Sequence, residues 1–253
     1  MPHILITNDD GIYAEGLRAL VGAMKGIGTV SVAAPSQERS ASAQALTLRQ
    51  PIFAEQVAER EWSIEGTPAD AMIVALHRLF PKKPDLVISG VNGGANLGEN
   101  IFYSGTVGAA MEAAINHVPA LAVSAVRGGG KFDFVSAAQF ARQLAELVLE
   151  KGLPRGVLLN ANIPFEWNGT VRFTRQSKKV TRTVLQEGAD PRGRTYYWLS
   201  ETQQVEEPEP DTDYAAIFAG AASITPLVLD RTGETSLSDL RHWAKLLERA
   251  VVR

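Results

Sequence analysis

The stretch His3-Ile-Leu-Ile-Thr-Asn-Asp-Asp-Gly-Ile-Tyr-Ala-Glu-Gly16 decides the fold of this 253-residue chain. Its apolar part, residues 4–6, is short and rich in β-branched side chains, which is typical of a strand buried on both faces of a parallel sheet. Asn8, Asp9 and Asp10 follow directly, at the carboxyl end of the predicted strand. Ligands of open α/β sheets bind in the crevice outside the strand ends, so this is a candidate site.

The Asp9-Asp10 pair has two interpretations. Because adjacent carboxylates repel each other, a divalent cation held by oxygen ligands is a simple partner for both. Alternatively, one Asp caps the helix predicted over residues 13–25 and the other is solvated, which is the more common arrangement for an isolated pair. The choice between these interpretations depends on what the other strand ends carry.

Composition favours one α/β domain with an elaboration, because 253 residues with 45% hydrophobic content can bury a sizeable core. A formal net charge of -3 gives no electrostatic footprint of nucleic-acid binding. The chain has no cysteine, which excludes disulfides, thiolate zinc sites and cysteine nucleophiles. Its start lacks the pattern of a signal peptide and no apolar run is long enough for a membrane span, so we expect a cytoplasmic protein without a membrane partner.

Alternating strand and helix patterns predict a doubly wound, mostly parallel, Rossmann-like sheet over residues 1–164. We expect core strands at residues 4–6, 29–34, 85–89, 119–125 and 156–160, and helices at residues 13–25, 69–80, 106–116 and 132–151. Residues 46–56 and 61–65 have the character of shorter, partly exposed strands.

Two further polar loops follow predicted strands. The loop over residues 36–42 carries Ser40, whose hydroxyl can serve a metal, a phosphate or simply a local turn. The glycine-rich stretch over residues 90–106 can wrap an anion with its N–H groups, and Ser104 can cap the next helix, whose N-terminus suits a phosphate. The alternative is that the glycine-rich stretch is only a tight connection whose small residues serve packing. The glycines of this stretch match neither a dinucleotide fingerprint nor a P-loop.

The character of the chain changes after residue 164. Residues 170–175, 180–186 and 195–204 have the pattern of exposed β-structure, so residues 165–222 predict a β-hairpin oligomerisation arm. Residues 223–253 predict a strand over 223–229 and a helix over 237–252 that return to the core or swap between cores. If the arm's strands pair, its basic and acidic clusters face each other, which disfavours nucleic-acid binding. The clusters are Arg175, Lys178, Lys179, Arg182, Arg192 and Arg194, then Glu201, Glu206, Glu207, Glu209, Asp211 and Asp213.

Seven motifs occur in order along essentially the whole chain, and together they closely resemble the SurE (survival protein E) family of metal-dependent nucleotidases. They are Thr7-Asn8-Asp9-Asp10-Gly11; Ala34-Pro35 with Glu38-Arg39-Ser40; Gly66-Thr67-Pro68-Ala69-Asp70; Ser89-Gly90-Val91-Asn92-x-Gly94-x-Asn96-x-Gly98; Ser104-Gly105-Thr106-Val107; Asn160-x-Asn162-Ile163-Pro164; and Ser223-Ile224-Thr225-Pro226-Leu227. Two positions depart from the family's pattern: Ala71 stands where Cys is common, and Ala41 stands where many members have Gly.

The resemblance implies a site for one divalent metal ion per subunit, Mg²⁺ or Mn²⁺, formed by Asp9, Asp10, Ser40 and Asn92. It also implies release of phosphate from nucleoside 5′-monophosphates, and it leaves open 3′-monophosphates and short polyphosphate. It further implies a homodimer or homotetramer formed through residues 165–253. The four proposed ligands are hard oxygen donors from three strand ends, which suits these ions better than zinc.

The chemistry also assigns a phosphate-binding set. The Asn96 amide, the Ser104 and Thr106 hydroxyls and the Gly105 N–H can hold phosphate oxygens, while Asn8 or one of the two aspartates orients the attacking water.

Two other classes of protein fit the sequence less well. A haloacid-dehalogenase-type phosphatase needs Asp-x-Asp after its first strand, whereas this loop has Asn8-Asp9-Asp10-Gly11. A non-catalytic, Mg²⁺-dependent phosphate-sensing module needs a phosphorylatable Asp after the third core strand, where this chain has Asn92.

Overall fold

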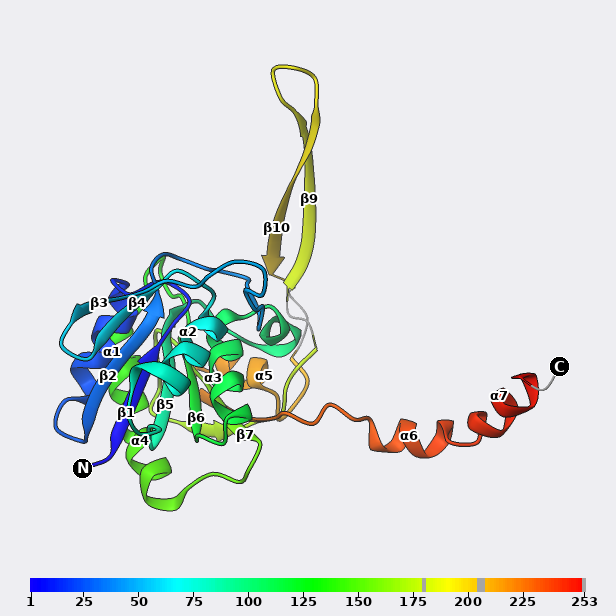
Figure 1. Cartoon of the computed structure of the whole chain (residues 1–253). Helices are drawn as coiled ribbons and strands as arrows, with labels where there is room; N and C mark the ends of the chain where they lie inside the picture. Colours follow the sequence, from blue (N-terminus) through cyan, green and yellow to red (C-terminus); the bar gives the residue numbers. More distant parts are fainter. Residues whose placement is uncertain (179–180, 204–207, 252–253) are drawn as a thin grey trace.

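The computed structural model describes residues 1–178, 181–203 and 208–251 as a sheet-centred body with a hairpin arm and a C-terminal extension (Figure 1). The body is built on one nine-stranded sheet. Its strands are β1 (His3–Thr7), β2 (Thr29–Pro35), β3 (Ala54–Ala58), β4 (Glu61–Ile64), β5 (Leu86–Gly93), β6 (Ala120–Ala125), β7 (Val157–Ile163), β8 (Val171–Phe173) and β11 (Ala222–Val228).

Six neighbouring strands of this sheet are parallel, in the spatial order β4-β2-β1-β5-β6-β7. If these six are numbered along the chain, the order is 3-2-1-4-5-6, which is that of the Rossmann fold. The predicted fold class is therefore confirmed. The chain reverses its direction of winding between β1 and β5, and the loops that follow these strands diverge to leave a crevice.

Helices cover both faces of the sheet. Helices α1 (Glu15–Met24) and α4 (Phe134–Lys151) pack together on one face, and α2 (Pro68–Val74) and α3 (Gly105–Ile115) pack together on the other. Residues of β1 alternate between the two cores: Ile4 and Ile6 belong to the first and Leu5 to the second. All three are fully buried, as expected of a central parallel strand.

The sheet is mixed at its edges. Strand β3 is antiparallel to β4, and β11 is antiparallel to β7 and parallel to β8. The strand expected over residues 46–56 begins only at Ala54. The preceding residues bond to the capping box of α2 instead, because Thr67 Oγ1 donates to the Ala45 carbonyl (2.7 Å) and the Thr47 N–H donates to Asp70 Oδ1 (3.0 Å).

The predicted hairpin arm is present as a separate two-stranded sheet, β9 (Thr181–Ala189) and β10 (Thr195–Gln203), which projects from the body (Figure 1). The backbone register places Glu201 opposite Thr183, and Thr202 opposite Arg182. Ion pairs lie before, at the tip of and after the ladder, namely Arg175–Glu209, Lys178–Glu209 and Arg194–Asp190. The expected strand residues Val180 and Gln204, and Lys179, Glu206 and Glu207 of the clusters, lie outside the described residues.

The remaining helices are short. A π-helix (Ala75–Leu79) continues α2, while the sequence patterns missed a 3₁₀-helix (Gly98–Phe102) and α5 (Asp213–Phe218). The helix expected over residues 237–252 is two helices, α6 (Glu234–Leu240) and α7 (Trp243–Val251), with a ring nitrogen of His242 bonded to the Asp239 carbonyl (2.7 Å) between them; Val252 lies outside the described residues. These helices extend away from the body (Figure 1). Within the described residues, no helix has the length and apolar character needed to cross a bilayer.

Candidate functional site

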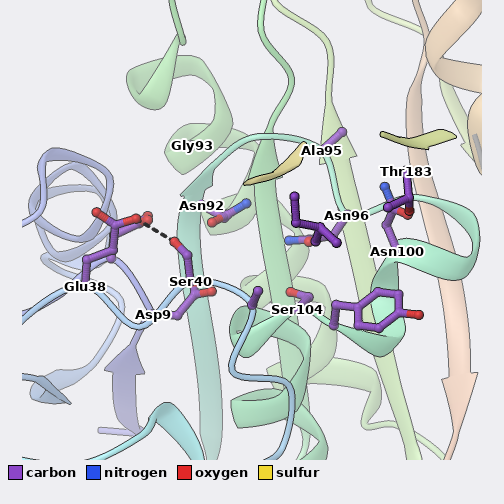
Figure 2. A pocket seen from close by; sticks show the side chains of 14 residues that line it. Asp9, Glu38, Ser40, Asn92, Gly93, Ala95, Asn96, Asn100, Ser104 and Thr183 are labelled. Carbon is purple, nitrogen blue, oxygen red and sulfur yellow. Dashed lines mark hydrogen bonds between the residues drawn. The ribbon is translucent and has the colours of Figure 1, made fainter. Parts of the chain in front are cut away.

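A cavity of about 670 Å³ lies outside the carboxyl ends of β1, β2 and β5 (Figure 2). Six of the predicted site residues line it: Asp9, Asp10, Ser40, Asn92, Asn96 and Ser104. The other lining residues are Glu38, Ala41, Gly93, Ala95, Asn100, Tyr103, Thr183 and Leu199. The structure therefore brings together side chains from three strand ends, as well as two residues of the hairpin arm.

One side of the cavity is acidic, and we define this acidic side as Asp9, Asp10, Glu38 and Ser40. The two aspartates follow β1, and the other two residues come from the loop after β2. The Ser40 hydroxyl donates a hydrogen bond to Glu38 Oε1 at 2.6 Å, which Figure 2 shows as a dashed line. The loop after β2 is fastened to the β1 loop, because the Arg39 N–H donates to the Asp9 carbonyl at 2.7 Å.

The acidic side disfavours its own negative charge. Burial raises the pKa of Asp9, although hydrogen bonds from the Thr106 side chain and from backbone N–H groups oppose the rise. Burial, the neighbouring Asp9 charge and the Glu38 charge raise the pKa of Asp10 to about 6, opposed by a backbone hydrogen bond from Gly93. A cation would reverse these trends, because a positive charge nearby favours the ionised carboxylates.

Asn8 is fully buried and does not line the cavity. Its side-chain amide donates to the Gly11 carbonyl (3.0 Å), and its Oδ1 accepts from the Gly11 N–H (3.2 Å). Gly11 has φ of +106°, a backbone conformation that side chains other than glycine's rarely allow. Asn8 therefore holds the turn that carries the two aspartates.

The opposite side of the cavity carries no formal charge, and we define this neutral side as Asn96, Asn100, Tyr103 and Ser104. All four come from the segment between β5 and α3. Figure 2 shows Asn96, Asn100 and Ser104 across the cavity from Glu38 and Ser40, with Asn92 between the two groups.

Asn96 is held firmly by the strands beside it. Its Nδ2 donates to Ser124 Oγ (2.8 Å) on β6, and its N–H donates to Asn162 Oδ1 (2.8 Å) on β7. Its carbonyl accepts from the side-chain amides of both Asn160 (2.8 Å) and Asn162 (3.1 Å). These contacts explain the Asn160-x-Asn162 motif, which fixes the neutral side in place without lining the cavity.

The N-terminus of α3 contacts Asp9. The Ser104 hydroxyl oxygen caps the helix by accepting from the Val107 N–H (3.1 Å), and Thr106 Oγ1 donates to Asp9 Oδ1 (2.5 Å). A Cβ on Gly105 would lie 2.8 Å from the Asp9 Cβ, so a side chain there would displace the carboxylate. Ser104 lines the cavity, whereas Gly105 and Thr106 lie behind Asp9.

The donor set fits a hard divalent cation. Asn92 Nδ2 donates to the Gly94 carbonyl (2.7 Å), which fixes the amide's orientation through its nitrogen while its oxygen remains a donor for a metal. Asp9 and Asp10 supply carboxylate oxygens and Ser40 a hydroxyl, and Mg²⁺ and Mn²⁺ prefer such ligands. Among the described residues, no three His, Cys, Asp or Glu side chains gather to hold a metal, so a site here depends on two carboxylates and neutral oxygens.

The sequence patterns missed several lining residues. Glu38 stands two positions before Ser40 in the same polar loop, and this spacing was a usable signal. Thr183 and Leu199 had no such signal, because they reach the cavity only through the placement of the hairpin arm.

Comparison with known proteins places the chain in a family. The family model for the survival protein SurE matches residues 4–183, a range that contains the described cavity residues up to Thr183. The chain belongs to the SurE family. A SurE relative from Geobacter sulfurreducens, named 5′-nucleotidase SurE, is 44% identical over 245 residues, which cover 95% of this chain and 93% of the relative. Another of the same name, from Moorella thermoacetica, is 42% identical over 252 residues and 96% of each chain.

A solved SurE structure has the same fold. The SurE protein from Aquifex aeolicus superposes with a TM-score of 0.86 at 36% sequence identity, covering 96% of this chain and 100% of that chain. The resemblance to the SurE family based on seven motifs is therefore confirmed. One departure from the family pattern also has a structural counterpart: Ala41 lines the cavity with φ of +55°, a conformation that favours Gly.

Proposed function

We propose that this protein is a metal-dependent phosphomonoesterase that hydrolyses nucleoside 5′-monophosphates to nucleoside and phosphate. The observation that carries the proposal is a single cavity with an acidic side, suited to a cation, opposite a neutral side rich in hydrogen-bond donors. The activity named for the SurE relatives supports the same reaction class.

We assign one divalent cation, Mg²⁺ or Mn²⁺, to Asp9, Asp10, Ser40 and Asn92. When bound, such an ion polarises a phosphoryl oxygen and lowers the pKa of a coordinated water. Asp9 and Asp10 are the pair whose negative charge a cation would neutralise, because burial raises the pKa values of both carboxyl groups. Asn8 contributes indirectly, by holding the Gly11 turn on which the pair is presented.

The neutral side binds the substrate's phosphate. The Ser104 hydroxyl oxygen accepts from the Val107 N–H, so the hydroxyl proton is directed to another acceptor. Asn96 offers the side-chain amide atoms that its bond to Ser124 does not use. These donors hold the phosphate's oxygens in the bound substrate and keep that hold while charge shifts to the leaving group. Gly105 and Thr106 support this side by positioning Asp9 and the start of α3.

The reaction is a direct displacement at phosphorus. Asp9 and Asp10 orient a water so that its oxygen forms the new P–O bond while the bond to the ester oxygen breaks. The water's proton ends on the departing nucleoside hydroxyl. The cavity volume of about 670 Å³ exceeds the needs of phosphate alone and falls in the range of small-molecule sites, so 3′-monophosphates and short polyphosphate are further candidate substrates.

We also infer a homodimer or homotetramer formed through residues 165–253. Large apolar side chains on the arm and on α7 support this assembly, because contiguous exposed apolar surface is typical of interfaces. They include Tyr197, Trp198, Leu246 and Leu247, each more than half exposed in the single chain. Sedimentation of the wild type against Leu246→Ser measures the proposed association.

The decisive assay is phosphate release from a panel of 5′- and 3′-nucleoside monophosphates after EDTA treatment, with Mn²⁺, Mg²⁺ or Zn²⁺ then added back. We expect release that depends on added metal and is lost in Asp9→Asn. Asp85→Asn is the matched control, since this exposed carboxylate accepts the His3 N–H at the opposite end of β1. Nucleotide binding without release would favour the sensing module, and a trapped phospho-aspartate would favour a haloacid-dehalogenase-type mechanism.

A further inference from the structure

The segment that forms the neutral side of the cavity is fastened to the root of the hairpin arm. We define the cavity loop as residues 94–104 and the arm root as residues 175–178 and 209–214, which flank the arm in the sequence. The bonded residues are 78 and 115 positions apart along the chain, yet the two segments are joined through both backbone groups of Gly98.

Asp213 makes the central contact. It is fully buried at the first turn of α5, and its Oδ2 accepts from the Gly98 N–H at 2.9 Å. Its Oδ1 accepts from the N–H groups of Ser177 (3.0 Å) and Tyr214 (2.7 Å). A buried carboxylate requires such donors, so its two oxygens lock the cavity loop and both segments of the arm root into one arrangement.

Gln176 and the glycine itself complete the connection. Gln176 Nε2 donates to the Gly98 carbonyl at 3.0 Å. Gly98 has φ of +53°, and a Cβ there would lie 2.2 Å from the Lys178 carbonyl oxygen, so the two segments touch through backbone atoms. Farther along, Asn100 Nδ2 donates to Thr181 Oγ1 (3.2 Å) at the start of β9.

The arm also reaches the cavity directly. Thr183 of β9 and Leu199 of β10 line it together with Asn96, Asn100 and Ser104 of the cavity loop. The arm root therefore bonds the loop that forms one part of the cavity wall, and that loop in turn bonds the start of the arm, which forms another part.

We propose that Asp213 is a positioning residue that sets the cavity loop against the arm and thereby determines how tightly the substrate's phosphate is bound. The kinetic part of this proposal rests on the proposed function, whereas the structural part does not. Asp213 is not part of the cavity lining, and its hydrogen bonds go to Gly98, Ser177 and Tyr214 and not to the acidic side, so its effect is expected on substrate binding and not on the metal.

The first test is Asp213→Asn. An amide has one acceptor oxygen, so either Gly98 or the Ser177–Tyr214 pair loses its partner. We expect KM for a nucleoside 5′-monophosphate to rise about tenfold, a loss typical of slight misplacement of binding groups. We expect kcat to stay within about twofold of wild type, because a loss of uniform substrate binding raises KM alone, and Mn²⁺ affinity to be retained, because Asp213 bonds no residue of the acidic side. Gln176→Ala removes only the contact to the Gly98 carbonyl and should shift KM in the same direction by less.

The matched control is Asp190→Asn at the tip of the arm. This carboxylate also accepts two backbone N–H groups, those of Arg192 and Arg194, but it lies away from the cavity loop. We expect its KM to remain that of the wild type. A role for Asp213 in folding alone would lower Tm without changing the KM of the folded protein.

Hydrogen exchange separates failure of this proposal from failure of the proposed function. Asp213→Asn should speed amide exchange in peptides covering residues 96–104, with or without turnover, while the β1 and β6 peptides stay protected. Unchanged exchange there together with unchanged KM, in a folded Asp213→Asn or Gln176→Ala protein, would overturn the proposal. If the wild type releases no phosphate with any metal, the proposed function fails and the exchange measurement still decides the positioning role.

Discussion

The acidic and neutral sides of the cavity are built in opposite ways. On the acidic side, burial and mutual repulsion raise the pKa values of Asp9 and Asp10. On the neutral side, Asn96 is held through its backbone and side chain by three residues of β6 and β7, and Ser104 caps a helix. One side therefore has a charge distribution that suits a cation, whereas the other is already fixed by the body of the protein. This difference predicts that substitutions on the two sides affect different steps.

The largest effect is expected from Asp10→Asn. The substitution removes a charge from the acidic side with little change in shape, so turnover at saturating substrate should fall by at least about 10²-fold, as when one preorganised electrostatic group is lost. Initial rates of phosphate release at several Mn²⁺ concentrations measure the effect. Asp85→Asn, at the opposite end of β1, should retain wild-type rates. Near-normal turnover in folded Asp10→Asn would remove the acidic side from the mechanism.

A smaller effect of a different kind is expected from Asn96→Ala. Loss of one hydrogen bond to a charged phosphate should raise KM about 10- to 100-fold and change kcat less. Steady-state kinetics with a nucleoside 5′-monophosphate separate the two parameters. The matched control is Asn116→Ala at the C-terminal end of α3, where the side chain bonds Glu112. A fall in kcat at unchanged KM would contradict the binding role of the neutral side.

The repulsion on the acidic side should also appear in stability. The pKa of Asp10 is about 6 in the folded protein, above its ordinary value of 3.8, so folding favours the protonated form. Its contribution to stability is greatest below pH 3.8 and is lost as the pH rises towards about 6. In EDTA, Tm should therefore fall between about pH 4 and pH 7 by more in the wild type than in Asp10→Asn. Excess Mn²⁺ should raise the wild-type Tm at neutral pH; equal pH profiles of the two metal-free proteins would count against the repulsion.

The smallest effect concerns the loop of the acidic side. Ala41 has φ of +55°, so Ala41→Gly should stabilise the protein by about 1 kcal/mol, the approximate cost of a left-handed residue that has a Cβ. Thermal or urea unfolding measures the change. Ala113→Gly, in the buried part of α3, is the opposite control and should destabilise. A lower stability in Ala41→Gly would show that the loop is not strained at this position.

The parts of this structure that the sequence could predict are those with local patterns. The β-branched run before Asp9, and the polar loops after the next two core strands, predicted a parallel sheet with a candidate site at its strand ends, and the family resemblance together with donor chemistry then named six of the residues that line the cavity. Each of these signals lies within a few residues of a buried strand, where periodicity and turn chemistry are strongest.

The parts of the structure that the sequence could not predict depend on contacts between distant segments. Thr183 and Leu199 reach the cavity through the arm, and Asp213 reaches Gly98 across 115 positions of the chain. The sequence also gives no sign that the Asn8 amide is used within its own turn, or that Thr47, in the strand expected over residues 46–56, bonds to the cap of α2. Side-chain hydrogen bonds of this kind replace regular structure and leave no periodic pattern.

The most direct test of the two-sided cavity is Mn²⁺ binding to the metal-free wild type, Asp10→Asn and Asn96→Ala, measured by isothermal titration calorimetry. We expect one site per chain in the wild type, its loss in Asp10→Asn and its retention in Asn96→Ala. Undiminished Mn²⁺ binding in folded Asp10→Asn, or its loss in Asn96→Ala alone, would contradict the division of the cavity into a metal side and a phosphate side.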